Sequence, residues 1–173
     1  MDEVIAMGAR AFIGCGSCGA LDKSIAVGHL LVPTAAIRGE GTSYHYLPPA
    51  REVLADADAV RAIETTLSGR GVAYELTKTW TTDAFYRETP GKVRKYRAEG
   101  CLAVEMEAAA FMAVARFRGV RFGMLLYGGD LVQAEGWDHR DWHSRTEIRE
   151  NLFWLAADAC VNLNPCPNGE HHA

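Results

Sequence analysis

The sequence predicts an α/β fold, and three observations lead to that prediction. Apolar runs alternate with amphipathic segments along residues 1–163, which is the pattern of strands separated by helices. No internal repeat or low-complexity tract interrupts this alternation. The 173 residues are 49% hydrophobic, which is enough to bury one large core. We therefore expect a single domain over residues 1–163 and a flexible tail over residues 164–173.

Strands are predicted where apolar residues run together, or alternate with polar ones, between turn residues. A short helix is expected to end at Gly8, before the first strand. A glycine-rich turn is expected to follow the first strand, and Gly128-Gly129 to follow the last one. The predicted strands are residues 11–16, 28–37, 72–80, 102–104 and 120–127.

Helices are predicted where apolar residues recur at a spacing of three to four. Asp56 is an N-cap candidate for the first long helix, and Gly100 and Gly119 stand where two later helices would end. The predicted helices are residues 56–69, 90–99, 105–119 and 141–161.

Three carboxylates stand at the ends of predicted strands, where α/β proteins bind their ligands. Glu105 and Glu107 lie at a strand-to-helix junction, and Asp130 follows Gly128-Gly129. An acid among apolar residues needs a hydrogen-bonding partner, such as a sugar diol. Two structural alternatives stay open: the glutamates can provide ordinary capping charge for the helix, and Asp130 can form an N-cap or an Asx turn.

Charge and composition exclude several classes of function. Eighteen basic and 22 acidic side chains give a net charge of −4, so the attraction to phosphate that most nucleic-acid-binding proteins use is missing. No apolar stretch is long enough for a membrane helix, and the N-terminus does not read as a secretion signal. We therefore expect a cytoplasmic protein without nucleic-acid or membrane partners.

The cysteines and histidines predict neither a disulfide framework nor a metal site. Five cysteines are an odd number, and their apolar surroundings favour buried thiols in a reducing compartment. Cys15 and Cys18 form one C-x-x-C without the second pair that a zinc site needs. His139 and His143 are four apart but lack the glutamate of a zinc-protease helix, so we expect solvated residues at a helix start.

Residues 14–19 match the G-x-G-x-x-G pattern of dinucleotide-binding proteins, but their setting does not. Only residues 20–27 separate them from the next apolar run, which is too short for the crossover helix of such a site. We therefore expect no nicotinamide or flavin cofactor. The glycines would instead let the backbone approach a ligand closely, beside the hydroxyl of Ser17.

Six segments of the chain, in their order along the sequence, resemble those of the nucleoside phosphorylase family, which includes the hexameric purine nucleoside phosphorylases and the uridine phosphorylases. The fifth segment, in its strand-to-helix setting, is the most specific of them. The resemblance implies a three-layer sandwich with a mixed central sheet flanked by helices. The segments are Gly16-Ser17-Cys18-Gly19-Ala20, Val27-Gly28-His29, Gly41-Thr42-Ser43-Tyr44, Thr82-Asp83-Ala84-Phe85-Tyr86, Val104-Glu105-Met106-Glu107-Ala108-Ala109 and Gly129-Asp130.

The resemblance implies how a nucleoside and its co-substrate phosphate would be bound. Glu107 would accept hydrogen bonds from the ribose hydroxyls, and Met106 would pack under the sugar. The hydroxyl of Ser17 would touch phosphate, and Phe85 would line the base pocket, where stacking contributes about 1–3 kcal/mol per base. The implied substrate-binding residues are Ser17, Cys18, Gly19, Phe85, Glu105, Met106 and Glu107.

The resemblance also implies a mechanism and a preference for purines. Asp130 falls where purine-specific members keep the acid that protonates the base, and Arg140 would hold or activate that acid. Phosphate would attack C1 of an oxocarbenium-like sugar, and no further cofactor is implied. Uridine-specific members place a glutamine and an arginine soon after the Phe-Tyr pair, whereas this chain continues Arg87-Glu88-Thr89. Uridine therefore stays open as a substrate.

Two departures from the family pattern open alternatives. Family members usually carry a phosphate-gripping arginine where this chain has Gly14, and their opening strands have no counterpart before Met1. We therefore expect a chain that begins partway into the fold. A nucleoside hydrolase and a catalytically inactive nucleoside-binding remnant are the alternative functions. An exposed sheet edge and apolar helix faces would favour a homo-oligomer, either a dimer or a trimer of dimers.

Overall fold

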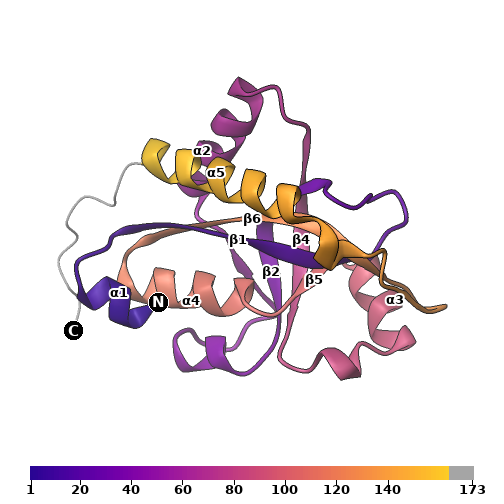
Figure 1. Ribbon diagram of the computed structural model, residues 1–173. Coiled ribbons are helices and arrows are strands. Elements are labelled where there is room, and N and C mark those ends of the chain that lie inside the picture. Colours follow the sequence, from indigo (N-terminus) through magenta and orange to yellow (C-terminus); the bar gives the residue numbers. More distant parts are fainter. Residues whose placement is uncertain (164–173) are drawn as a thin grey trace.

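The computed structural model describes residues 1–163, which form a seven-stranded sheet with helices on both faces (Figure 1). The helices are α1 (Asp2–Ala6), α2 (Ala57–Gly69), α3 (Pro90–Ala98), α4 (Ala108–Arg118) and α5 (Thr146–Asn162), and the short 3-10 turns are η1 (Thr42–His45), η2 (Phe85–Arg87) and η3 (Trp142–Ser144). Helices α2 and α5 cover one face of the sheet, and α1, α3 and α4 lie on the other. The α/β class and the three-layer arrangement are confirmed, whereas the expected tail lies outside the described residues.

The sheet closes on itself through its longest strands. The strands are β1 (Ala11–Ala20), β2 (Leu30–Gly39), β3 (Glu52–Leu54), β4 (Tyr74–Thr82), β5 (Cys101–Glu105), β6 (Arg121–Val132) and β7 (Trp137–Asp138). Their order is β3-β2-β4-β5-β1-β6-β7, and β2 pairs in addition with β6, with Leu30 opposite Tyr127. The strands β2, β4, β5, β1 and β6 therefore form a ring. The sheet is mixed, because β1–β6, β2–β4 and β4–β5 are parallel and the other pairs are antiparallel.

The glycines of β1 and β6 do not make the turns that the sequence predicted. Strand β1 continues to Ala20 and β6 continues to Val132, and the two pair in parallel, with one irregularity after Cys18. A Cβ atom on Gly19 would lie 2.8 Å from Val132 Cγ2, and one on Gly128 would lie 2.7 Å from Ile25 Cγ2. These glycines thus allow close packing inside strands, and ladder hydrogen bonds take the place of turns.

Helices α2 and α3 lie where the sequence predicted them, whereas α4 begins at Ala108 instead of residue 105 and the last helix also begins later than predicted. Asp56 caps α2, because its carboxylate accepts hydrogen bonds from the backbone N–H groups of Asp58 and Ala59. Gly119 ends α4 in the left-handed conformation. The last helix starts at Thr146 and not at residue 141, because Asp141 has a φ of +51°, which an α-helix does not accept. No helix within residues 1–163 has the length and apolar character needed to cross a membrane.

Gly39 lies where β2 passes over the most enclosed aromatic side chain of the core. Trp80 of β4 is 1% exposed and packs on Tyr96 of α3, with 4.2 Å between the ring centroids. A Cβ atom on Gly39 would lie 2.6 Å from Trp80 Nε1 and 2.7 Å from the carbonyl oxygen of Thr81. The last residue of β2, which pairs with Thr82, therefore has to be a glycine unless β4 shifts.

Gly39→Ala is expected to lower the free energy of unfolding by about 1–3 kcal/mol, because the added methyl group displaces Trp80 and the Thr81 backbone. Urea denaturation measures the change. Gly16→Ala is the matched control, since Gly16 also lies in a strand but no atom lies within 4 Å of its Cβ position. Equal midpoints for the two variants would contradict this account of Gly39.

Candidate functional site

Four strands bring the sequence-predicted residues to one end of the ring. Thr81 of β4 pairs with Glu105 of β5, and Gly19 of β1 pairs with the neighbouring Val104. On the other side of β1, Cys18 pairs with Gly128 of β6. Backbone hydrogen bonds fix these pairs side by side, so the residues that follow them lie close together.

Glu105 is buried and locks the junction between β5 and α4. Its Oε2 accepts hydrogen bonds from the backbone N–H groups of Glu107 and Ala108, at 2.8 and 2.6 Å. Its Oε1 accepts from the hydroxyls of Thr81 and Thr79, at 2.6 and 3.2 Å. Burial raises the pKa of Glu105 to about 7, although these donors act in the opposite direction. Glu105 thus ties the end of β5 to β4 and to the start of α4.

Glu107 and Met106 are exposed beside this buried acid. Glu107 occupies the N-cap position of α4, but its side chain makes no capping hydrogen bond, because Glu105 already accepts the helix N–H groups. Glu105, and not Glu107, therefore provides the hydrogen-bonding cap of α4. Met106 is 41% exposed. The carboxylate of Glu107 is left without a hydrogen-bond partner within residues 1–163, next to an apolar side chain that faces solvent.

The residues 17–19 contribute backbone and hydroxyl groups rather than a thiol. Cys18 is buried, and its Sγ donates a hydrogen bond to the carbonyl oxygen of Tyr127 at 3.4 Å. Burial, with the nearby charges of Glu105 and Asp130, raises the pKa of this thiol. The predicted role of Cys18 in substrate binding therefore cannot involve its side chain. Ser17 is half-buried, one residue before it in β1.

Asp130 lies within β6 and not in a turn, so the alternatives of an N-cap or an Asx turn are wrong. Its Oδ2 accepts a hydrogen bond from the indole N–H of Trp137 at 2.5 Å. Arg140 was expected to hold this acid, but its guanidinium donates to the carbonyl oxygen of Ile25 at 2.6 Å. Arg140 itself has a φ of +52°, in the left-handed region.

Trp137 is a residue that sequence reasoning missed. The pairing of Val132 with Trp137 places the indole across a hairpin from the end of β6. Gln133 and Gly136 close this hairpin with backbone hydrogen bonds of 3.0 and 3.3 Å. The sequence signal that could have revealed this hairpin is the short, glycine-containing segment 133–136 between an apolar run and Trp137.

Phe85 lies in η2, after β4, and is 50% exposed. Its ring contacts that of Tyr86, with 4.0 Å between centroids. The aromatic surface expected for a base is thus present and open to solvent in the single chain.

Glu88 follows this aromatic segment and was also missed. It is half-buried, and burial together with the nearby charge of Asp130 raises its pKa to about 7, while Lys92 lowers it. The sequence offered no signal for Glu88, because the like-charged partner comes from a strand far along the chain.

The structure bears on the predictions made for the cysteines and for the histidines. Cys15 is exposed and Cys18 buried, so the expectation of a buried thiol is wrong for Cys15, and strand alternation turns the two apart. His139 and His143 contact each other through their Nε2 atoms but do not share a helix, since η3 precedes α5. Within residues 1–163, no group of three or more His, Cys, Asp or Glu residues could hold a metal ion.

Comparison with known proteins assigns a family to this fold and site. The family model described as the Phosphorylase superfamily matches residues 1–161. Guanosine phosphorylase from Halorubrum lacusprofundi is 33% identical over 133 residues, which cover 76% of this chain and 55% of that protein. Uridine phosphorylase from Escherichia coli is 28% identical over 139 residues, which cover 72% of this chain and 55% of that protein.

Solved structures share the fold. Purine nucleoside phosphorylase from Toxoplasma gondii aligns with a TM-score of 0.81 at 24% identity, covering 94% of this chain and 67% of that one. AMP nucleosidase from Bacteroides thetaiotaomicron aligns with a TM-score of 0.68 at 28% identity, covering 87% and 59%. The chain spans about half the length of the phosphorylases it matches, 55% in each case.

The fold defines the class, an α/β protein with a mixed central sheet and helices on both faces. The family match makes the assignment specific: this chain belongs to the phosphorylase superfamily. The resemblance to nucleoside phosphorylases that the motifs indicated is therefore confirmed.

Glu105 is expected to make stability depend on pH. Its pKa in the folded chain, about 7, is above its ordinary value of 4.5, so the folded state binds this proton more tightly than the unfolded state. The free energy of unfolding should therefore fall as pH rises through this window, by at most about 1.4 kcal/mol per pH unit for one group. Urea denaturation between pH 5.5 and pH 7.5, as a rough window, measures the slope.

Glu105→Gln removes one titrating group and is expected to make that slope shallower, whatever it does to absolute stability. Glu88, whose pKa is also raised to about 7 by burial, keeps its own share of the slope. Glu3→Gln, at an exposed glutamate in the first turn of α1, is the control and should keep the wild-type slope. An unchanged slope in Glu105→Gln would show that Glu105 stays ionised throughout.

Proposed function

We propose that this chain carries the nucleoside site of an enzyme that cleaves the N-glycosidic bond of a nucleoside with phosphate, and that purine nucleosides are favoured. The observation that carries the proposal is the carboxylate of Glu107, exposed and without a hydrogen-bond partner within residues 1–163, beside the exposed Met106. A vicinal diol matches such a carboxylate, because its two hydroxyls can donate to the two oxygens. No cofactor besides phosphate is part of the proposal.

The remaining groups would divide the work between phosphate and base. The hydroxyl of Ser17 would contact phosphate, beside backbone that Gly16 and Gly19 leave open. Phe85 would stack on the base, and its exposure of 50% leaves a ring face available. Asp130 would lie beside the base, where a proton must reach the departing base. Positioning, electrostatics and protonation of the leaving group would supply the catalysis.

The proposal also states which nucleophile attacks the sugar and which kind of base leaves. Phosphate is favoured because guanosine and uridine phosphorylases are among the relatives. Water is the alternative, since one structural relative is an AMP nucleosidase and Gly14 stands where the family's phosphate-gripping arginine is expected. The ring of Phe122 lies 3.1 Å from the place where a Cβ atom on Gly14 would be. An aromatic ring thus occupies the space next to position 14, where an arginine side chain would begin. Purine is favoured over uridine by Asp130.

Incubation of the purified chain with inosine, adenosine and uridine, each with and without phosphate, tests the proposal. Base release that requires phosphate is the expected result, with the two purine nucleosides cleaved faster than uridine. Release without phosphate would replace phosphorolysis by hydrolysis. Binding without release would leave the inactive nucleoside-binding alternative.

Glu107→Ala is expected to weaken nucleoside binding about 10- to 100-fold, because a hydrogen bond to a charged group contributes roughly 1.5–3 kcal/mol. Isothermal titration calorimetry with inosine measures the affinity. Glu3→Ala replaces an exposed glutamate in the first turn of α1, at the opposite end of the molecule, and should bind as the wild type does (Figure 1). Wild-type affinity in Glu107→Ala would remove this residue from the site.

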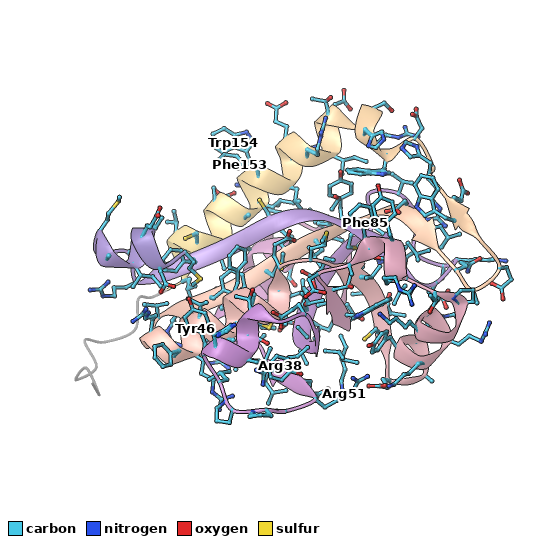
Figure 2. The ribbon with its side chains drawn as sticks, turned by 90° about the horizontal axis from the view of Figure 1, so that it is seen from below. Arg38, Tyr46, Arg51, Phe85, Phe153 and Trp154 are labelled. Atoms are coloured by element: carbon cyan, nitrogen blue, oxygen red, sulfur yellow. The ribbon has the colours of Figure 1, made fainter. Side chains whose placement is uncertain are left out.

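The homo-oligomer and the cytoplasmic location stay predictions. Phe153 and Trp154 support the first of them, because they are 55% and 60% exposed and project from α5 (Figure 2). Large exposed aromatic side chains next to each other are typical of surfaces that associate.

A further inference from the structure

Asp130 lies at the base end of the proposed site, by which we denote the hairpin of β6 and β7 and the neighbouring end of β1. Asp130 forms no ion pair within residues 1–163. The guanidinium of Arg140, which the resemblance assigned to this acid, donates instead to the carbonyl oxygen of Ile25. A neutral group contacts the carboxyl group in its place, namely the indole of Trp137.

Asp130 lies in a bulge of β6. Between the pairs that β6 forms with β1 at Gly128 and at Leu131, β6 has one residue more than β1. Such a bulge commonly redirects a side chain beside a functional site, because the extra residue is not bound by the ladder. The side chain of Asp130 therefore does not have to follow the alternation of the rest of β6.

The register of the hairpin brings Trp137 to this acid. Val132 of β6 pairs with Trp137 of β7, and Asp130 stands two residues before Val132, so Asp130 and Trp137 are diagonal neighbours. Diagonal neighbours lie roughly 7–8 Å apart, a gap that a large aromatic side chain can bridge. The indole N–H of Trp137 donates to Oδ2 of Asp130 at 2.5 Å.

Trp137 is anchored at the surface, and burial does not account for its place, because it is 62% exposed. The ring of His139 packs edge-on against the indole, with 5.4 Å between the ring centroids. After β7, the backbone N–H of Arg140 donates to the carboxylate of Asp138 at 3.0 Å, and its guanidinium fixes this segment to the loop before β2. The hairpin thus holds the indole in front of Asp130.

Resting on the proposed function, we infer that Trp137 is a positioning residue: its N–H holds Oδ2 of Asp130, so that Oδ1 is the oxygen that gives a proton to the departing base. Oδ1 has no hydrogen-bond partner within the described part of the chain. It lies 3.6 Å from the place where a Cβ atom on Gly19 would be, so a glycine there keeps the space beside Oδ1 free. An indole N–H can donate to the acid in either protonation state and therefore holds Asp130 before and after the transfer.

Asp130 begins the step protonated on Oδ1. The bond between C1′ and N9 of the purine breaks, and its electron pair goes to the base. The proton on Oδ1 moves to N7, so the base leaves neutral and Asp130 becomes a carboxylate, whose charge strengthens the hydrogen bond from Trp137. An oxygen of hydrogen phosphate forms the new bond to C1′. The proton that phosphate loses returns to Asp130 through solvent.

Trp137→Phe removes the N–H and keeps an aromatic ring. It is expected to lower kcat for inosine about 10-fold or more and to leave KM within about twofold, because a general acid contributes its usual factor of about 100 or more only when it is correctly placed. The variant should cleave 7-methylguanosine at close to the wild-type rate, because that base already carries a positive charge and leaves neutral without a proton. A wild-type kcat for inosine, or an equal loss with 7-methylguanosine, would overturn the inference.

Two further variants show whether Trp137 acts through Asp130. Trp154→Phe is the matched control, since Trp154 is 60% exposed and lies on α5, and it should change kcat for neither nucleoside. Asp130→Asn has no proton to give, so adding Trp137→Phe to that variant should lower kcat no further. Additive losses in the double variant would mean that Trp137 acts on another group, and this would contradict its role as the residue that positions Asp130.

A measurement that does not depend on activity separates this inference from the proposed function. The indole N–H resonance that is missing from the NMR spectrum of Trp137→Phe identifies Trp137 among the four tryptophans. This resonance should lie further downfield in the wild type than in Asp130→Ala, because a hydrogen bond to the acid deshields the proton. A resonance that ignores Asp130→Ala would overturn the inference even if the chain cleaves nucleosides. A wild-type chain that releases no base would overturn the proposed function and the role of Trp137 together.

Discussion

The buried carboxylate of Glu105 is the contact on which the rest of the site depends. It joins β4, β5 and α4, since hydroxyls of one strand and backbone N–H groups of the helix converge on its two oxygens. Thr81 extends this bridge, because its hydroxyl also accepts the N–H of Ala109 at 2.9 Å. With the helix N-terminus satisfied from inside, the next acid along the chain is free to face solvent.

Two pairs of acids show the same contrast between a hydrogen-bonded and a free side chain. At the junction of β5 and α4, Glu105 is buried and fully hydrogen-bonded, and Glu107 is exposed. At the base end, Asp130 is engaged by Trp137, and Glu88 is open. In each pair one acid is fixed by the protein and the other keeps its hydrogen-bonding capacity for a ligand. Burial raises the pKa of Glu105 and of Glu88 to about 7, and the nearby charges of Glu107 and Asp130 act in the same direction.

The sequence was sufficient where the determining contacts are local. The caps at Asp56 and Gly119, the helical spacing and the acids at the end of β5 depend on neighbours within a few residues, and all were predicted. The strand lengths of β1 and β6 were not, because a glycine that turns and a glycine that packs look alike until the opposite strand is known. Arg140 was misjudged and Glu88 was missed for the same reason, since the group that each of them faces lies far away along the chain.

The pairing of Leu30 with Tyr127 has a consequence for how the chain acquires its structure. This contact joins the second strand to the sixth, so the ring stays incomplete while the ribosome is still making the middle of the chain. Contacts between residues so far apart in sequence are slow to form, because the intervening loop must first give up its freedom. Until β6 emerges, Leu30 and Leu31 of β2 lack their partners in β6, and the nascent chain has to remain unaggregated without them.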